Sequence, residues 1–191
     1  MKIEKLLKIV EVLGKDPFSG YNINQVSRLS GMDLATTYRM LREMESKNEV
    51  LRERKGNNSF YRLNLKNTTA LKYCELSSIE KRKKFLSKNP GIYGKVSGLI
   101  EIADSVVMFG SLARGEKKPR DMDVLLLFKK KSDVRKIENS LKGTTISPIY
   151  TEFGEFKNKI ANKDKLVMEI IRDGIVLSGE YEYWKSTSEA V

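Results

Sequence analysis

The sequence predicts a protein of mixed α and β structure that folds as two small domains, one α+β and one α/β. In the first third of the chain, apolar residues recur at helical spacing and are followed by two short segments of alternating character. In the second half, apolar strands alternate with helices, which predicts a mixed sheet flanked by helices. A chain of 191 residues is long enough for two modest cores. The predicted boundaries are 1–66 for the first domain, 67–90 for a helical connector and 91–191 for the second domain.

The first 64 residues predict a helix, a helix-turn-helix and a hairpin. The first helix stops at Gly14, a short second helix ends at Gly31, and Asp33 is placed to cap the third. Along the third helix we expect a buried stripe made of Leu34, Thr37, Leu41 and Met44. The exposed face then carries Ala35, Thr36, Arg39 and Arg42. Residues 50–54 and 59–63 alternate as strands around a turn with a basic tip, Lys55-Gly56-Asn57-Asn58.

This region resembles the winged helix-turn-helix domains of prokaryotic transcription regulators, especially in the segment Thr37-Tyr38-Arg39-x-Leu41. The resemblance implies double-stranded DNA as the partner, with the major groove faced by Ala35, Thr36, Tyr38 and Arg39. The other DNA-binding residues that we expect are Arg42 on the same helix and, near the phosphate backbone, Arg52, Arg54, Lys55 and Arg62. The sequence leaves the oligomeric state open; a two-fold symmetric DNA footprint would imply that the protein binds as a homodimer. The alternative is that the winged helix serves as a dimerisation or protein-docking module.

The composition limits both the chemistry and the partners. With no histidine and only Cys74, the chain cannot build a Ser-His-Asp or Cys-His site, and a structural zinc would lack ligands. We expect Cys74 to be a packing residue. The net charge of +11 favours an anionic partner such as nucleic acid, although a lysine-rich surface selected for solubility or heat resistance would give the same count. Without a secretory segment or an apolar stretch of ~20 residues, a cytoplasmic protein without a membrane partner is expected.

The connector predicts two helices rather than a flexible linker. Asn67-Thr68-Thr69 is placed to start the first helix, and Ser77-Ser78-Ile79-Glu80 has the capping-box pattern that starts a second. Asn89-Pro90-Gly91 stops the second helix.

The stretch from Val106 to Leu127 carries the chemistry of the second domain. An apolar strand runs into Gly110-Ser111, which opens a short helix, and another apolar strand begins at Asp121-Met122-Asp123. Glycine lets the backbone approach phosphate oxygens, while the N–H groups of a helix start and the Ser111 hydroxyl favour anions. Because side chains alternate along a strand, Asp121 and Asp123 project from one face, where both can bind Mg²⁺.

These residues resemble the signature of the nucleotidyltransferase superfamily related to DNA polymerase β. Phe109-Gly110-Ser111 is followed after nine residues by Asp121-x-Asp123, and Ala113-Arg114-Gly115-Glu116 is most similar to the minimal nucleotidyltransferases of archaea and bacteria. The resemblance covers residues 89–185. It implies that Gly110, Ser111 and Arg114 bind the nucleotide and that Asp121 and Asp123 are catalytic residues that bind the metal ion. The implied cofactor is Mg²⁺, and the implied ligand or substrate is a nucleoside triphosphate. The alternative is a tight turn beside two solvated aspartates.

One feature of that family is missing. Active members carry a third carboxylate on the next strand, as metal ligand or as base for the attacking hydroxyl. The corresponding segment, 144–151, contains no acid, and Pro148 marks an edge or the end of regular pairing. Glu152 is a possible surrogate, but a residue at the start of the next helix is the simpler interpretation. Beyond it we expect a helix over 156–172 with a Gly174 cap, a strand over 175–177 and an aromatic tail, all without assigned chemistry.

Two functions follow from these patterns. The first is a DNA-binding transcription regulator that carries a nucleotidyltransferase-fold domain able to bind a magnesium–nucleotide complex. The second is an active nucleotidyltransferase that moves a nucleoside monophosphate onto a protein or nucleic-acid hydroxyl, including an antitoxin-like action on a partner toxin. The missing third acid favours the first; the intact Gly-Ser and Asp pairs favour the second.

Overall fold

The computed structural model describes residues 3–116, 121–130, 137–138, 141 and 143–191, and the chain divides into two compact units. The first comprises residues 1–77 with Val191, and the second residues 78–190. Helix α4 (Thr68–Lys88) contributes to both, because the boundary falls in its middle. Within the described part of the chain, no helix combines the length and the apolar character needed to span a membrane.

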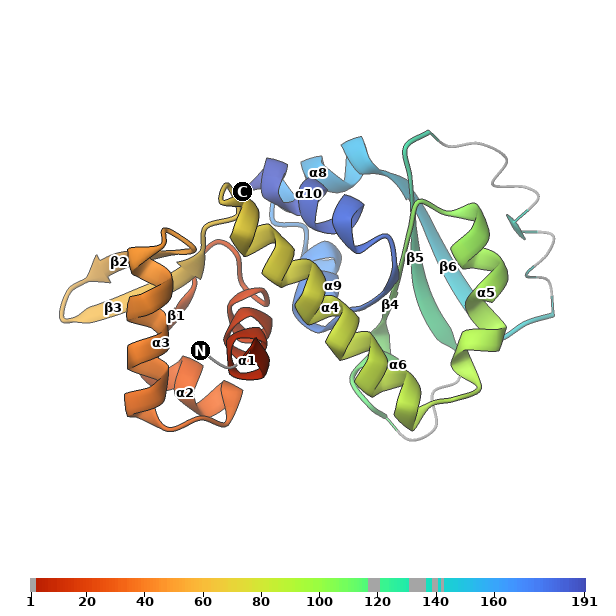
Figure 1. Ribbon diagram of the computed structural model, residues 1–191. Helices are drawn as coiled ribbons and strands as arrows, with labels where there is room; N and C mark the ends of the chain where they lie inside the picture. The colour runs from red at the N-terminus through yellow and green to blue at the C-terminus, as the bar shows by residue number, and fades with distance from the viewer. Residues whose placement is uncertain (1–2, 117–120, 131–136, 139–140, 142) are drawn as a thin grey trace. The chain divides into compact units, whose positions relative to one another are not determined.

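The first unit consists of helices packed against a small antiparallel sheet (Figure 1). The sheet order is β1-β3-β2. The elements before α4 are α1 (Ile3–Leu13), β1 (Tyr21–Asn22), α2 (Ile23–Ser30), α3 (Leu34–Ser46), β2 (Val50–Lys55) and β3 (Asn58–Leu63). Their interior is filled by Leu6, Ile9, Leu13, Val26, Leu41, Met44 and Leu63. The predicted helix, helix-turn-helix and hairpin are therefore confirmed.

Local signals in the sequence set the ends of α2 and α3. Asn22 and Gln25 form a reciprocal capping box, in which each side-chain oxygen accepts a backbone N–H of the other at 2.9 Å. Gly31 ends α2 in the left-handed region, at φ 68°. The predicted cap of α3 is confirmed, because Asp33 Oδ1 accepts the Thr36 N–H at 2.8 Å. The turn between the two helices is thus fixed at both ends.

The predicted buried stripe of α3 needs one correction. The buried residues are Thr37, Met40, Leu41 and Met44. Leu34, which we expected inside, is 48% exposed. The stripe begins one turn later than predicted, so the first turn of the helix keeps a large apolar side chain at the surface.

The connector is a single helix, which corrects the prediction of two. Asn67 Oδ1 accepts the N–H groups of Thr69 and Ala70, so the predicted start is confirmed. The serine pair does not interrupt the helix, because both hydroxyls find partners outside it. Ser77 Oγ donates to the Leu7 carbonyl oxygen, and Ser78 Oγ accepts the Trp184 indole N–H at 2.8 Å. Cys74 is fully buried in the same helix, as expected for a packing residue, and burial raises the pKa of its thiol.

The second unit is a four-stranded mixed sheet with helices on both faces (Figure 1). The order is β6-β5-β4-β7, with β5 and β6 parallel and the other pairs antiparallel. Its elements after α4 are α5 (Ile92–Ile102), β4 (Ser105–Phe109), α6 (Gly110–Ala113), β5 (Met122–Phe128), β6 (Ile146–Glu152), α8 (Phe153–Ala161), α9 (Lys165–Asp173), β7 (Ile175–Ser178) and α10 (Glu180–Ala190). The mixed sheet flanked by helices agrees with the predicted architecture, and Pro148 lies on an edge strand as expected.

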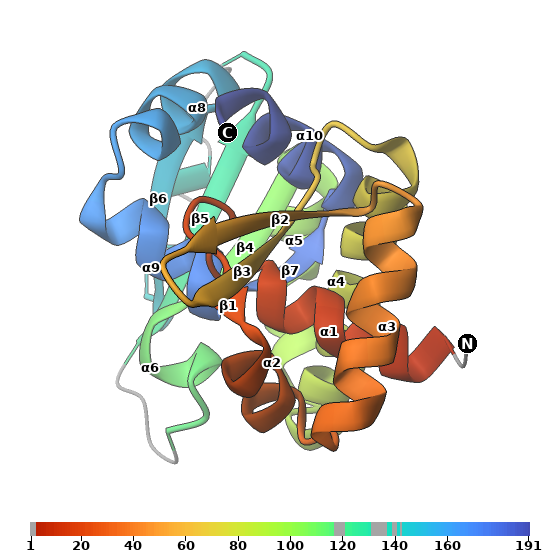
Figure 2. The same cartoon turned by 90° about the vertical axis from the view of Figure 1, so that its left-hand side faces the viewer.

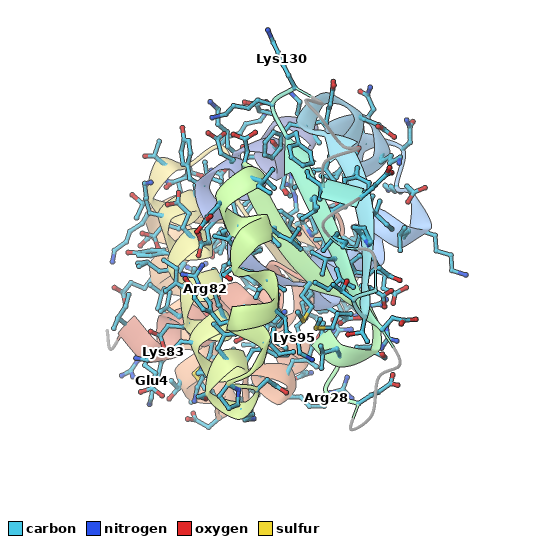
Figure 3. All side chains as sticks on the ribbon, turned by 90° about the vertical axis from the view of Figure 1, so that its right-hand side faces the viewer. Glu4, Arg28, Arg82, Lys83, Lys95 and Lys130 are labelled. Atoms are coloured by element: carbon cyan, nitrogen blue, oxygen red, sulfur yellow. The ribbon has the colours of Figure 1, made fainter. Side chains whose placement is uncertain are left out.

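Alternation along the strands divides the core of this unit into two layers. One face of the sheet joins α5 and the end of α4 in a cluster that includes Phe85, Val96, Leu99, Met108 and Leu126. The other face contacts α8, α9 and α10. Arg82 of α4 is half-buried, donates to the Leu177 carbonyl oxygen and pairs with Glu180, whereas Lys130 after β5 points away from the surface (Figure 3).

The C-terminal part departs from the sequence prediction in two places. The expected single helix over 156–172 is two helices, α8 and α9. Lys163 has a positive φ of 54°, and Asp164 Oδ1 then caps α9 through the Val167 N–H. The aromatic tail is helix α10, in which Tyr183 and Trp184 are buried with their rings 5.4 Å apart.

Candidate nucleic-acid interface and candidate phosphate site

The outward face of α3 carries most of the predicted groove residues. Ala35, Tyr38, Arg39 and Arg42 are exposed, and Thr36 is half-buried. Tyr38 is 52% exposed. Arg42 is tied to the next turn, because its Nη1 lies 2.8 Å from Glu45 Oε2. The helix therefore presents a phenol and two guanidinium groups on one side, with its buried residues Met40, Leu41 and Met44 on the other.

The predicted backbone contacts lie on two different faces of the hairpin. Gly56 has φ 59° at the first position of the two-residue turn, as a type II′ hairpin requires. Arg52 and Arg54 share the face of Tyr61, while Lys55 and Arg62 project from the opposite face beside Phe60. Arg52 Nε donates to Ser59 Oγ at 2.9 Å, and Lys55 Nζ lies 3.3 Å from Glu53 Oε2.

The face of Tyr61 is the one that borders α3. Burial raises the pKa of the Tyr61 hydroxyl, the nearby cations Arg52 and Arg42 oppose the shift, and Glu45 and Tyr38 add to it. Three of these four groups belong to α3, which lies beside the hairpin in Figure 2. The structure therefore places Arg52 and Arg54 on the side of α3, and Lys55 and Arg62 on the opposite face of the hairpin.

A helix pair with a short turn, an exposed second helix and a basic hairpin define a DNA-binding helix-turn-helix domain with a wing. Residues 2–50 match the IclR helix-turn-helix domain, a family model that spans α1 to α3 and the start of β2. The N-terminal region is thus a DNA-binding domain of the IclR type. No curated protein and no solved structure matches the chain.

In the second unit, the motif residues meet where β4 and β5 lie side by side. Phe109 pairs with Asp123 across the two strands, and Gly110 follows with φ 72°. A Cβ on Gly110 would stand 2.1 Å from Asp123 Oδ2. The backbone and the carboxylate can approach this closely only because residue 110 has no side chain. Ser111 comes next, in the four-residue helix α6.

Four charged groups surround this point. Burial and the neighbouring charge of Asp121 raise the pKa of Asp123, Arg114 opposes the shift, and Glu169 adds to it. Asp121 is exposed and Asp123 half-buried, as expected for two carboxylates at the mouth of a strand. Arg114 forms an ion pair with Glu169 and has Glu116 Oε1 at 3.5 Å from Nη2. The predicted residues Gly110, Arg114, Asp121 and Asp123 are therefore close together.

The sequence did not identify Glu169 as part of this group. It lies on α9, which contacts α6, so its place depends on how distant segments pack. In the sequence it is one residue of the helix predicted over 156–172, and no motif around it indicates a role in the site.

Glu152 does not supply the missing acid. It pairs with Phe128 at the far end of the parallel strands, whereas Ser147 is the residue beside Asp123. At about 3.3 Å per residue, Glu152 is separated from that position by roughly 16 Å along β6. Glu152 ends β6 and stands at the cap position of α8, in agreement with the simpler interpretation.

The donor set would suit a metal ion that brings most of its own ligands. Among the residues that the structure describes, no group of three or more His, Cys, Asp or Glu side chains could hold a metal. Mg²⁺, however, is commonly held by one or two carboxylates, with water and substrate phosphates completing its shell. Asp121 and Asp123 fit a Mg²⁺ ion that arrives with a phosphate ligand, and not an ion coordinated by protein alone.

Proposed function

We propose that the chain is a sequence-selective transcription regulator in which α3 lies in the major groove and Arg52 and Arg54 contact the flanking phosphates. The IclR-type domain supports DNA as the partner. The observation that carries the finer proposal is that α3 and the Arg52 face of the hairpin border the same residue, Tyr61. Groove contacts then select the sequence and the wing adds affinity. Lys55 and Arg62 add long-range attraction only.

The test is a mobility-shift titration of genomic fragments, including the promoter of the protein's own gene, at several salt concentrations. We expect affinity to fall steeply with salt, with a slope of about −0.9 per phosphate contact. Arg39→Ala should reduce discrimination between sequences by roughly 1–3 kcal/mol if Arg39 reads a guanine. Arg52→Ala should weaken all sequences alike.

Two results of this titration are decisive. If no fragment is bound better than random duplex and Arg39→Ala behaves like Arg52→Ala, the regulator proposal fails and the domain is better regarded as a protein-docking module. A two-fold symmetric footprint would support binding as a homodimer, because half-sites mirror the symmetry of the protein.

We further propose that the C-terminal unit has a nucleotidyltransferase-type fold and binds a nucleoside triphosphate with Mg²⁺. The close approach of Gly110 to Asp123 supports it, because it brings the Gly110 backbone to the carboxylate of Asp123, and Ser111 is the next residue of the chain. Ser111 would donate to phosphate oxygens, and Arg114 would exchange its carboxylate partners for phosphate. Asp121 and Asp123 would hold Mg²⁺, which neutralises phosphate charge when bound.

Thermal unfolding tests this second proposal. A nucleoside triphosphate with Mg²⁺ should raise the Tm of the second unit through linkage, and the same nucleotide with a chelator should not. Replacing both aspartates (Asp121→Asn with Asp123→Asn) should abolish the rise. Absence of a metal-dependent effect in the wild type would refute nucleotide binding.

Turnover is a separate question for the same unit. An active transferase would join an acceptor hydroxyl to the α-phosphate and release pyrophosphate, and it needs a group that takes the hydroxyl proton. The β6 neighbour of Asp123 is Ser147, which is a poor base at neutral pH. Incubation with labelled ATP, GTP, CTP and UTP, Mg²⁺ and cell extract would detect transfer directly.

A further inference from the structure

The first two turns of α3 each expose one large apolar or aromatic side chain. Leu34 is the first residue of the helix and is 48% exposed, and Tyr38, one turn later, is 52% exposed. Residues four apart on a helix are neighbours on its surface, so the two side chains form one patch. The Asp33 cap and the Thr37 Oγ1–Asp33 carbonyl hydrogen bond hold the backbone of this turn in place.

The surroundings of this patch are cationic. Arg39 and Arg42 follow on the same helix, and Arg52 lies on the bordering face of the hairpin. An apolar patch edged by guanidinium groups suits a partner that combines apolar points with dense negative charge. The major groove of DNA has both, because each thymine places a 5-methyl group on the groove floor between two rows of phosphates.

We infer that Leu34, with Tyr38 beside it, contacts thymine methyl groups in the major groove, and that this patch makes the domain select thymine at those positions. The inference rests on the proposed regulator function and names a specificity-determining residue for it. Residues at the start of a recognition helix are those that reach base edges, and Leu34 is the first residue of α3. An aliphatic side chain there gains free energy by covering a methyl group and cannot satisfy the exocyclic amino group of cytosine.

Uracil substitution isolates the methyl group, because uracil differs from thymine only by lacking it. A fragment selected from a random duplex pool is amplified with dTTP or with dUTP, and its Kd is measured for the wild type, Leu34→Ala and Leu76→Ala. Leu76 of α4 is the matched control, since it is the same residue type in the same unit and is 44% exposed. Single thymine-to-uracil changes in the footprint then locate the contacted base.

The wild type should bind the uracil duplex about fourfold more weakly for each methyl group contacted. Leu34→Ala should bind the thymine and uracil duplexes with nearly equal Kd, while Leu76→Ala should keep the wild-type ratio of the two Kd values. Leu34→Gln, which keeps the length of the side chain but is polar, should also bind the two duplexes with nearly equal Kd. Thermal unfolding would verify that all variants fold.

The outcomes separate this inference from the function on which it rests. Selective DNA binding with a thymine-to-uracil ratio that Leu34→Ala leaves unchanged would overturn the inference and retain the regulator. Failure to bind any duplex selectively would overturn both. If Leu34→Ala changes the sedimentation coefficient and not the ratio, the patch is a contact between protein chains and the inference is wrong.

Discussion

The two candidate sites of this protein are built in opposite ways. The candidate DNA-binding surface of the first unit consists of side chains that project from regular elements, α3 and the β2–β3 hairpin. The candidate phosphate site of the second unit lies where strands end, with the Gly110 backbone in close contact with the Asp123 carboxylate. The first is a pattern on a surface, and the second is a feature of close packing.

This difference determines how each site responds to change. An exposed side chain such as Arg39 can be replaced without disturbing the helix that carries it, so a substitution there alters binding and little else. At Gly110, even one added methyl group collides with the Asp123 side chain. Substitutions in the second site should therefore change stability and binding together.

The largest effect is expected for Gly110→Ala. The left-handed backbone alone costs an alanine about 1 kcal/mol, and the contact with Asp123 should bring the total to about 3 kcal/mol. Urea unfolding followed by the fluorescence of Trp184, the only tryptophan in the chain and a residue of the second unit, measures this cost.

Two further variants sharpen that measurement. Gly115→Ala has a similar backbone requirement, φ 84°, but no described atom lies within 4 Å of its Cβ, so it should cost only about 1 kcal/mol. In an Asp123→Ala background, the cost of Gly110→Ala should fall toward this value, because the carboxylate is gone and only the Cβ of residue 123, at 3.3 Å, remains close. Additive costs in this double-mutant cycle would show that the two residues are not packed together.

A smaller effect should distinguish two adjacent serines of α4, one from each unit. Ser78→Ala leaves the buried Trp184 indole N–H without its acceptor and should cost about 2 kcal/mol. Ser77→Ala removes a 3.3 Å bond to the Leu7 carbonyl and should cost about 0.5 kcal/mol, because that oxygen lies within α1 and retains its helical bond. Urea unfolding of both variants tests this; equal costs would contradict the assignment of these hydroxyls.

Much of the first unit could be predicted from its sequence, because its structure is set by local signals. Gly31 and Asp33 fix the turn between the helices, and the alternation from Val50 to Leu63 predicts the hairpin. The sequence failed where a neighbour decided the outcome. Leu34 fits the apolar period of α3 but lies outside the packed part of the helix. Ser77-Ser78 resembles a helix start, but the Ser77 hydroxyl donates to the Leu7 carbonyl oxygen and the Ser78 hydroxyl accepts the Trp184 indole N–H.

The second site was only partly predictable for the same reason. The spacing predicted that Asp121 and Asp123 share one face of a strand, but β5 begins at Met122, so Asp121 precedes the strand. The two carboxylates are still close enough for Asp121 to raise the pKa of Asp123. The role of Glu169 depends on the packing of α9 against α6, and the exclusion of Glu152 depends on the register of β6 against β5. Neither the packing of two helices nor the register of two strands is encoded in a short window of sequence, so the sequence pattern alone could not predict the place of either glutamate.

The next prediction uses two neighbouring residues of the wing. Arg54 and Lys55 are both exposed and adjacent in β2, but they project from opposite faces, and only Arg54 shares the face that borders α3. Arg54→Ala should weaken DNA binding about fivefold and lower the salt slope by about one. Lys55→Ala should change the affinity less and leave the slope unchanged. Mobility shifts over a salt series measure both, and equal slopes for the two variants would mean that DNA covers both faces of the wing.

The smallest effect concerns the cap that positions α3. The Thr36 N–H that bonds to Asp33 lowers the pKa of this carboxyl below its ordinary value of 3.8. Because the folded pKa is the lower one, the charged cap stabilises the fold above the ordinary value, and this stabilisation is lost as the pH falls through the folded pKa. Asp33→Asn keeps a capping oxygen without a titrating group, so the wild type should have the higher Tm at pH 7, and the difference should disappear toward pH 2. The Tm of both proteins is measured over this pH range, and the effects of the other titrating groups cancel in the difference between the two values. A Tm difference that stays constant with pH would show that the charge of Asp33 contributes nothing to the stability of the helix.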